Sequence, residues 1–259
     1  MDAGMNRADF YASLRRRDSG VFGSSLSQAQ VEGAEAILDA AAWHELEDPR
    51  HVANVLGQVY HETGGYMSPI KETVFASHRD KAPSDAEVIR RLDRAFSRGQ
   101  LPWVRTPYWR DGWFGRGMIQ ITHKRNYRTM GERLGVDLVG DRDLTLDPEI
   151  SARIAVVGMA EGLFTGVGLA DFFDESTDDA RGARRVVNGP DGTDSKVAGH
   201  HNAFMRALRE GGWQLPAEPG PVKPTPEDEA EDAEALLAYI AKLIDDHRNR
   251  EDPSQKEAA

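Results

Sequence analysis

The sequence contains no cysteine among its 259 residues. Disulfide bonds, thiolate metal sites and cysteine nucleophiles are therefore excluded. Residues 1–14 lack the apolar core of a signal peptide, and no apolar run approaches the length needed to cross a membrane. We therefore expect synthesis in the cytoplasm without a signal peptide, so that any action outside it requires release by separate machinery.

Dense blocks of positive charge are also scarce. The chain carries 32 Lys and Arg residues against 43 Asp and Glu residues, which gives a formal net charge of −11. Beyond Arg15-Arg16-Arg17 there is no dense basic block of the kind that nucleic-acid-binding proteins present. The sequence therefore predicts no nucleic-acid partner.

Several segments combine a helix start signal with apolar residues at three- and four-residue spacing. Ser27-x-x-Gln30 and Ser84-x-x-Glu87 match the capping box, in which side chain and backbone bond reciprocally. Asp48-Pro49 and Asp147-Pro148 place a capping Asp before a Pro at the first helical position. Only Met118–Thr122 has the character of a strand. The sequence predicts a mainly α fold with at most a small β element.

The C-terminal part of the chain differs in composition from the rest. Residues 216–226 contain five prolines in eleven residues, which is typical of an extended linker. Residues 227–259 are predicted to form an acidic amphipathic helix with an apolar stripe from Ala233 to Ile244. This helix either packs back on the globular domain of residues 1–215 or docks to another protein or a second copy of the chain.

The segment from Tyr60 to Gly65 places a carboxylate at the end of a predicted helix. Apolar residues from Val52 to Val59 recur at the spacing of one buried face, and Glu62 continues that stripe. Gly64-Gly65 is suited to end the helix in a left-handed conformation. A carboxyl at the edge of an apolar face loses hydration when ionised, which raises its pKa toward that of a general acid.

A second interpretation is that the carboxylate of Glu62 simply extends into solvent. The preceding His61 does not complete a zinc site, because the pattern His-Glu-x-x-His fails at Gly65. We therefore predict no metal ion and no organic cofactor.

Aromatic residues are concentrated between Trp103 and Gly117. Three of the five tryptophans fall there, and their spacing fits neither a helix nor a strand. Flat rings on an irregular loop either stack on a ligand such as a sugar ring or fill the core beneath the loop. Glycines at 115 and 117 allow the backbone to approach a ligand closely. The candidate binding residues of this segment are Tyr108, Trp109, Trp113 and Arg116.

Three motifs occur in the order seen in glycoside hydrolase family 19. The resemblance covers roughly residues 9–213 and is strongest to the phage endolysin branch of these chitinase-like enzymes. The motifs are His61-Glu62-Thr63-Gly64-Gly65, then Phe114-Gly115-Arg116-Gly117-Met118-Ile119-Gln120-Ile121-Thr122 with Asn126-Tyr127, and Arg185-Val186-Val187-Asn188-Gly189.

The resemblance implies a bilobed, lysozyme-like helical fold with a catalytic cleft. It implies that Glu62 is the general acid and that the hydroxyl of Thr122 helps to hold the attacking water. It also implies that Arg185 supports the catalytic carboxylates. The further positions that it places near substrate are His61, Gln120, Tyr127 and Asn188.

The plant enzymes do not indicate the position of the second carboxylate, because this chain lacks the segment that carries the general base in them. The phage branch has a Glu shortly after the acid, which matches Glu72. We expect Glu72 on a hydrated loop beside cations such as Lys71; the other interpretation is an ordinary exposed loop carboxylate. Asp80 and Asp85 are the reserve candidates.

Together these features predict an inverting hydrolase of β-1,4 bonds in peptidoglycan, acting as a phage or prophage lysis enzyme on the cell wall after release. An acid and a base that flank a water about 6.5–9.5 Å apart would perform that reaction. A chitinase is the near alternative, because both substrates contain N-acetylglucosamine. A secreted antibacterial effector and a non-catalytic wall-binding or virion component are the others.

Overall fold

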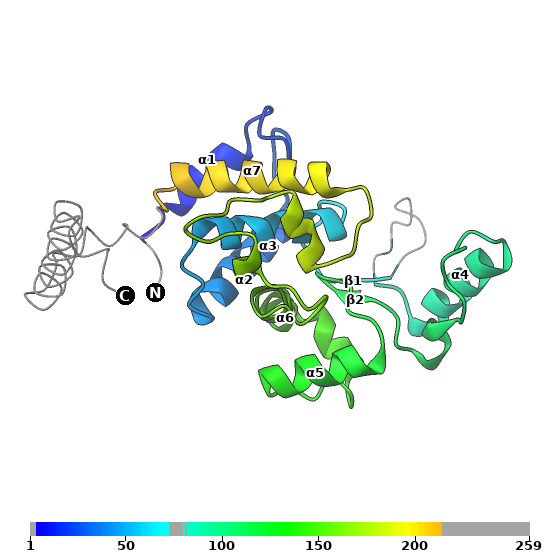
Figure 1. Cartoon of the computed structure of the whole chain (residues 1–259). Coiled ribbons are helices and arrows are strands. Elements are labelled where there is room, and N and C mark those ends of the chain that lie inside the picture. The colour runs from blue at the N-terminus through cyan, green and yellow to red at the C-terminus, as the bar shows by residue number, and fades with distance from the viewer. Residues whose placement is uncertain (1–3, 73–79, 81, 214–259) are drawn as a thin grey trace, which may run out of the picture. The chain divides into compact units, whose positions relative to one another are not determined.

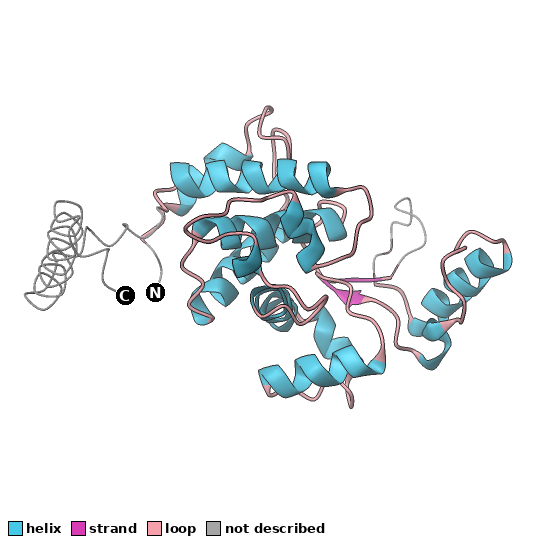
Figure 2. Ribbon diagram, viewed as in Figure 1, coloured by secondary structure: helices cyan, strands magenta, loops and turns pink. Residues whose placement is uncertain are grey.

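The structure is a computed structural model that describes residues 4–72, 80 and 82–213. Within these residues it is mainly helical, with one two-stranded sheet, as the sequence predicts (Figure 2). In chain order the elements are α1 (Arg7–Leu14), α2 (Gln28–Trp43), α3 (Pro49–Glu62), β1 (Ile70–Lys71), α4 (Asp85–Ser97), η1 (Tyr108–Asp111), β2 (Arg116–Gly117), α5 (Lys124–Leu134), η2 (Arg142–Leu146), α6 (Pro148–Ala160), η3 (Leu169–Asp171), η4 (Gly182–Val186) and α7 (Asp194–Glu210), where η marks a short 3₁₀-helix.

Helix α3 is the central element and ends at Glu62. Asp48 caps its first turn by accepting a hydrogen bond from the Arg50 amide, with Pro49 at the first position. Every residue from Val52 to Val59 is buried, so α3 is enclosed on more than the one face that the sequence predicts. At Gly57 a Cβ atom would lie 2.9 Å from the His201 amide nitrogen, so this glycine lets α7 pack closely along α3.

The apolar core is divided between a large cluster and two small ones. The large cluster is formed by α1, α2, α3, α6 and α7, which pack around one another (Figure 1). One small cluster joins α5 to α6, and the other joins α4 to Trp109 and Phe114. Helices α4 and α5 therefore have cores of their own, apart from the core that holds α3.

The sheet connects these parts. Strands β1 and β2 pair antiparallel, with Ile70 opposite Gly117 and Lys71 opposite Arg116. The strand predicted at Met118–Thr122 is wrong, because residues 118–120 form a turn. The backbones of Arg116 and Ile121 pair across that turn, and the Gln120 side chain donates to the Gly117 carbonyl at 2.8 Å. The turn carries Gln120 and Thr122 out of the sheet.

The predicted helix starts agree closely with the structure. Ser27 and Gln30 form both hydrogen bonds of a capping box. Ser84 accepts from the Glu87 amide, but the Glu87 carboxylate bonds to arginines of α4 instead of returning to Ser84. The linker at 216–226 and the helix at 227–259 lie outside the described residues, so both stay predictions. None of the described helices is long and apolar enough to cross a membrane.

Two buried histidines of α7 predict acid sensitivity. Burial lowers the pKa of His200 and that of His201 to about 4, from an ordinary value of 6.5. Between these values the unfolded chain binds protons that the folded chain does not, so acid favours unfolding. We expect the free energy of unfolding to fall by about 1.4 kcal/mol per pH unit for each histidine in this window. Urea titrations at a series of pH values measure this slope.

The slope of the unfolding free energy against pH should depend on the buried imidazole rings of His200 and His201. His201→Gln should reduce it, whereas His123→Asn should leave it unchanged because His123 is exposed. An unfolding free energy that stays constant from pH 6.5 to pH 4 would contradict the prediction.

Candidate active site

A cavity of about 400 Å³ lies where α3, η1, the turn after β2 and the start of α5 meet. Five of the predicted site residues line it: Glu62, Tyr108, Gln120, Thr122 and Asn188. The other lining residues are Ile119, Ile121, Asn126, Phe164 and Val187. The cavity therefore combines one carboxylate with hydroxyl and amide groups and with apolar side chains.

Glu62 is held by a buried arginine. Its side chain is 19% exposed, and its Oε1 accepts a hydrogen bond from Arg184 Nη1 at 2.7 Å. Arg184 also donates to Gln58 at 2.8 Å and to Asp191 at 2.7 Å, so its guanidinium is fixed on three sides. Glu62 thus sits against a cation as well as at the end of the apolar face that the sequence predicts.

Asp191 completes this network. Burial alone would raise its pKa, but hydrogen bonds from Arg184 and Thr193 outweigh burial and hold the pKa of Asp191 well below its usual range. The carboxylate of Asp191 therefore stays ionised and anchors Arg184 beside Glu62.

The arginine that contacts Glu62 is Arg184 and not Arg185, which corrects the prediction. Arg185 is exposed, and its guanidinium lies 4.9 Å from the centre of the Phe172 ring. Both residues belong to η4, where one position changes the direction of a side chain by about 120°. An assignment that is off by one residue therefore selects a side chain on another face.

Glu72 follows β1 and is fixed by the aromatic segment. Its Oε1 accepts from the Tyr108 hydroxyl at 2.7 Å, and its Oε2 accepts from the Gly115 amide at 2.9 Å. Burial, followed by the nearby Glu72 carboxylate, raises the pKa of Tyr108 far above its usual value, so Tyr108 remains a hydroxyl donor. Glu72 is therefore hydrogen-bonded to Tyr108, a residue that lines the cavity.

Gly115 is the position where this arrangement requires a glycine. A Cβ atom there would lie 2.8 Å from Gln120 Oε1 and 3.4 Å from Glu72 Cβ. The absence of a side chain at Gly115 therefore leaves room for Gln120 of the cavity wall, at the residue whose amide donates to Glu72.

Lys71, the cation expected beside Glu72, is paired with other carboxylates. Lys71 points away, because successive strand residues face opposite sides of a sheet. Its ammonium group pairs with Asp85 at 2.8 Å and with Asp143 at 3.4 Å. The reserve candidates do not line the cavity either: Asp85 is taken up in this ion pair, and Asp80 is exposed and accepts from the Ala82 amide.

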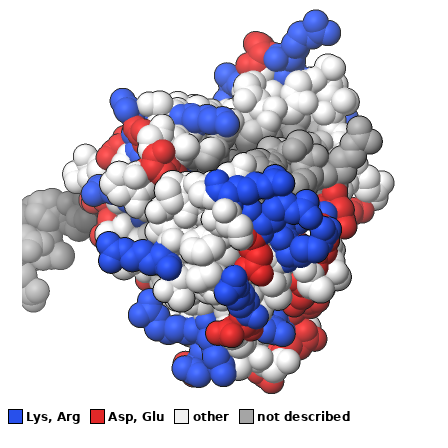
Figure 3. Space-filling model, turned by 90° about the vertical axis from the view of Figure 1, so that its right-hand side faces the viewer, with Lys and Arg blue, Asp and Glu red and all other residues white. Residues whose placement is uncertain are grey.

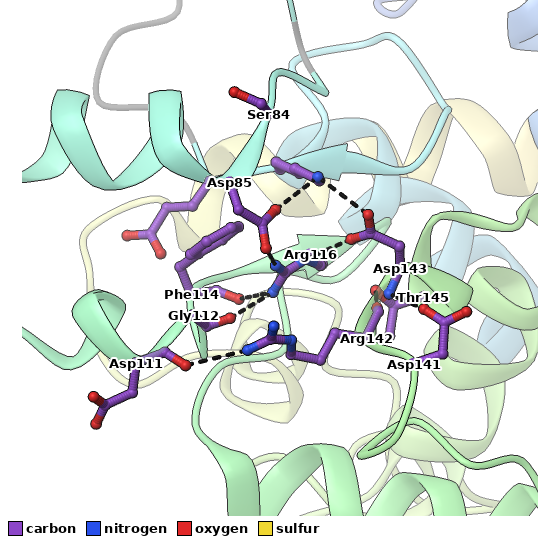
Figure 4. A network of polar contacts seen from close by, with 12 residues as sticks. Ser84, Asp85, Asp111, Gly112, Phe114, Arg116, Asp141, Arg142, Asp143 and Thr145 are labelled. Carbon is purple, nitrogen blue, oxygen red and sulfur yellow. Dashed lines mark hydrogen bonds and ion pairs between the residues drawn. The ribbon is translucent and has the colours of Figure 1, made fainter.

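Arg116, predicted to bind substrate, is a structural residue. It is fully buried and pairs with Asp85 at 2.6 Å and Asp143 at 3.0 Å (Figure 4). It also donates to the Gly112 carbonyl at 2.8 Å and to the Tyr127 hydroxyl at 3.2 Å. The network joins α4, η2 and the aromatic segment, and Arg116 has no exposed surface for a ligand, so the substrate-binding prediction for Arg116 is wrong.

This buried charge predicts a large effect on stability. Arg116→Met should lower the free energy of unfolding by about 2 kcal/mol, because it removes the hydrogen bonds of a fully buried guanidinium to Asp85, Asp143 and the Gly112 carbonyl, while Lys71 still pairs with both carboxylates. The matched control is Arg110→Met, which removes an exposed ion pair with Asp93 and should cost less than about 1 kcal/mol. Chemical denaturation of both variants measures the difference. Equal stabilities would contradict the structural role of Arg116.

The aromatic segment fills the core more than it faces the cavity. Trp109 is fully buried and donates to Asp93 at 2.9 Å. Tyr127 is fully buried and donates to the Phe114 carbonyl at 2.9 Å. The prediction that Trp109 and Tyr127 contact substrate is therefore wrong. Trp113 packs edge-on against Tyr127, with ring centres 5.3 Å apart, and does not line the cavity.

The structure also shows where His61 and Asn126 lie relative to the cavity. His61 is half-buried beside His200 and does not line the cavity; burial, with help from Arg184 and Lys196, lowers the pKa of His61. Asn126 was part of a recognised motif without an assigned role, yet it lines the cavity while its neighbour Tyr127 is buried. Adjacent helix positions point about 100° apart, which explains why one faces the cavity and the other the core.

Among the residues that the structure describes, no group of three or more His, Asp or Glu side chains is arranged to hold a metal ion. The groups available in and beside the cavity are carboxylates, hydroxyls and amides. Carboxylates transfer protons, and hydroxyl and amide groups hydrogen-bond to the hydroxyls and acetamido groups of sugars.

Comparisons with known proteins agree with this chemistry. Chitinase 11 of Oryza sativa subsp. japonica is 33% identical over 112 residues, which cover 41% of this chain and 34% of the rice protein. Endochitinase 4 of Solanum tuberosum is 49% identical over 45 residues, covering 17% of this chain and 15% of that protein. The chain thus matches about a third or less of the length of these relatives.

Among solved structures, chitinase C from Streptomyces griseus HUT6037 aligns with 82% of this chain and 94% of its own, at 20% identity and a TM-score of 0.48. The family model described as chitinase class I matches residues 28–160, which include Glu62, Glu72 and Thr122. That match spans half of the chain. The chain therefore belongs to glycoside hydrolase family 19, the family of the class I chitinases.

Proposed function

We propose that this protein hydrolyses the β-1,4 glycosidic bonds of peptidoglycan by an inverting acid/base mechanism. The observation that carries the proposal is the cavity lined by Glu62 from α3 and by Tyr108, which holds the second carboxylate, Glu72. Two carboxylates that come from different elements suit a reaction in which one protonates the leaving oxygen and the other activates water.

The surrounding residues support these roles. Glu62, which ends α3 at the cavity wall, would give its proton to the glycosidic oxygen. Glu72 would accept a proton from the attacking water, with its orientation held by Tyr108 and the Gly115 amide. The Thr122 hydroxyl would help to hold that water, and the amides of Gln120 and Asn188 would bind the sugar.

Peptidoglycan is favoured over chitin by the resemblance to the phage endolysin branch, in which a Glu follows shortly after the general acid as Glu72 does here. Chitin is the second candidate, because the matched plant proteins bear chitinase names and both polymers contain N-acetylglucosamine. A non-catalytic wall-binding or virion component is disfavoured, because Glu62 and Thr122 are both present at the cavity.

The experiment is to incubate the protein with purified peptidoglycan and, separately, with chitin, and to analyse the soluble fragments by mass spectrometry. Disaccharide-peptide fragments from peptidoglycan are the expected result, since their masses identify a cut glycosidic bond. Soluble fragments from chitin alone would replace the proposal with a chitinase. Fragments from neither polymer would point to a binding protein.

The proposal includes the place of action. We propose synthesis in the cytoplasm and action on the cell wall after release, as a phage or prophage lysis enzyme or as a secreted effector. A protein partner or self-association through the C-terminal segment, residues 216–259, is also a proposal. Size-exclusion chromatography of the full chain and of a chain that ends at Leu215 would test the latter.

A further inference from the structure

The segment from Asp85 to Arg110 carries a charge opposite to that of the whole chain. It contains six arginines and three acidic residues, whereas the chain has a net charge of −11. Helix α4 lies at the outer edge of the molecule (Figure 1). Figure 3 views the molecule from that side and shows Lys and Arg side chains gathered in a broad patch on this face. The positive charge of this segment therefore faces solvent.

The acidic residues of this segment are already neutralised. All three take part in ion pairs: Asp85 with Lys71 and Arg116, Glu87 with Arg90 and Arg91, and Asp93 with Arg110. Arg94, Arg98 and Arg105 are exposed and have no ion pair within the described residues. Three exposed arginines of this segment therefore have no carboxylate partner among the residues that the structure describes.

The orientation of α4 separates its apolar and charged faces. Val88, Leu92 and Ala95 are buried, whereas Arg94 and Arg98 are exposed one helical turn apart. Cations near a helix C-terminus interact favourably with the helix dipole, which accounts for part of their placement. The dipole does not account for Arg105, which lies beyond the helix.

An exposed tryptophan belongs to the same segment. Leu101 and Val104 pack on the apolar cluster of α4, and the Val104 amide donates to the Leu101 carbonyl at 3.1 Å. Between them Trp103 is 73% exposed. Because its neighbours anchor the turn, the ring is presented to solvent by an ordered loop, where it is available for contact with a ligand.

We propose that Arg94, Arg98, Arg105 and Trp103, here called the α4 surface, bind the carboxylate-bearing chains of peptidoglycan outside the cavity. This inference rests on the proposed function. Arginine pairs with carboxylates through two parallel hydrogen bonds, and an exposed indole stacks on sugar or peptide groups. Peptidoglycan carries carboxylates on its peptides and chitin carries none, so the surface selects the anionic polymer. Arg105 lies three residues before Tyr108 in the sequence, and Tyr108 lines the cavity.

The test measures binding to insoluble peptidoglycan sacculi by co-sedimentation. The full chain carrying Glu62→Gln is used so that the polymer stays intact. The test variant adds Arg94→Gln, Arg98→Gln and Arg105→Gln, and a second variant adds Trp103→Ala alone. The matched control adds Arg15→Gln, Arg17→Gln and Arg209→Gln, which neutralise three exposed arginines elsewhere on the molecule.

The triple variant of the α4 surface should bind sacculi about tenfold more weakly, as expected for the loss of three exposed ionic contacts. The matched control should bind unchanged. Binding of the parent protein should weaken as salt rises, and also when the carboxylates of the sacculi are capped with ethanolamine by carbodiimide coupling. Binding to chitin should not differ between the variants. Thermal melting of each variant checks that it is folded.

Several results would overturn the inference. Equal binding by the α4-surface variant and the matched control would show that these arginines do not contact the polymer. Insensitivity to carboxylate capping, or tighter binding to anionic lipid vesicles than to sacculi, would assign the surface to another partner. These outcomes are separate from failure of the proposed function, which appears as absence of fragments released by the unmodified protein.

Discussion

Replacing Glu62 with Gln is expected to lower the rate of glycan hydrolysis by about a hundredfold or more. The amide has nearly the shape of the carboxyl and its oxygen still accepts the hydrogen bond from Arg184, so the fold should persist. The amide has no proton to give to the leaving oxygen. Release of soluble fragments from peptidoglycan, compared with the unmodified protein at equal concentration, measures the effect.

The matched control is Glu32→Gln, an identical change at an exposed position of α2. It should retain full activity, which separates loss of a proton donor from loss of charge. Near-normal clearance of cells stripped of their outer membrane by the Glu62→Gln protein would remove Glu62 from the mechanism.

Replacing Glu72 with Gln should also reduce activity by about a hundredfold or more, because the water would lose its base. The Tyr108 hydroxyl should still donate to the amide oxygen, so this contact persists. The initial rate of fragment release measures the effect, at a pH where the unmodified protein is active.

Asp80→Asn provides the comparison for Glu72. Asp80 is exposed and its side chain accepts from the Ala82 amide, so its replacement should leave activity intact. The reverse pattern, with Glu72→Gln active and Asp80→Asn inactive, would mean that the base is Asp80.

Local signals explain what could be predicted from the sequence. Ser27, Asp48 and Asp147 cap helices through hydrogen bonds to amides two or three residues away, so adjacent residues contain the whole signal. For the same reason the position of Glu62 at the end of α3 followed from the apolar spacing and the glycines at 64 and 65.

Residues whose partners lie far away in the sequence were harder to interpret. Arg116 has the composition of a ligand-binding residue, but its partners Asp85 and Asp143 are 31 and 27 residues away. No local pattern reveals that these carboxylates bury it. Likewise Trp109 lies in the core and donates a hydrogen bond to Asp93 on α4. The sequence alone does not show that these two elements are in contact.

The prediction of Arg185 instead of Arg184 as the arginine that contacts Glu62 was wrong for a different reason. The motif match aligned the correct segment, but η4 is a 3₁₀-helix in which neighbouring side chains diverge strongly. The sequence Ala183-Arg184-Arg185-Val186 contains no local signal that separates the two arginines, because the apolar residues flank both of them, yet only Arg184 is buried. A buried arginine in that position requires carboxylates, which Glu62 and Asp191 supply.

We propose that Glu62 and Glu72 act on the two sides of one glycosidic bond with a water between them. Proton NMR of the first products released from β-linked substrate tests it most directly, because the new reducing end keeps its configuration for a short time after cleavage. We expect the α-anomer to appear first and then to equilibrate, because attack by water inverts the configuration of the β-linked sugar. Initial formation of the β-anomer would contradict it, since retention requires a nucleophile or the substrate's own acetamido group in place of water.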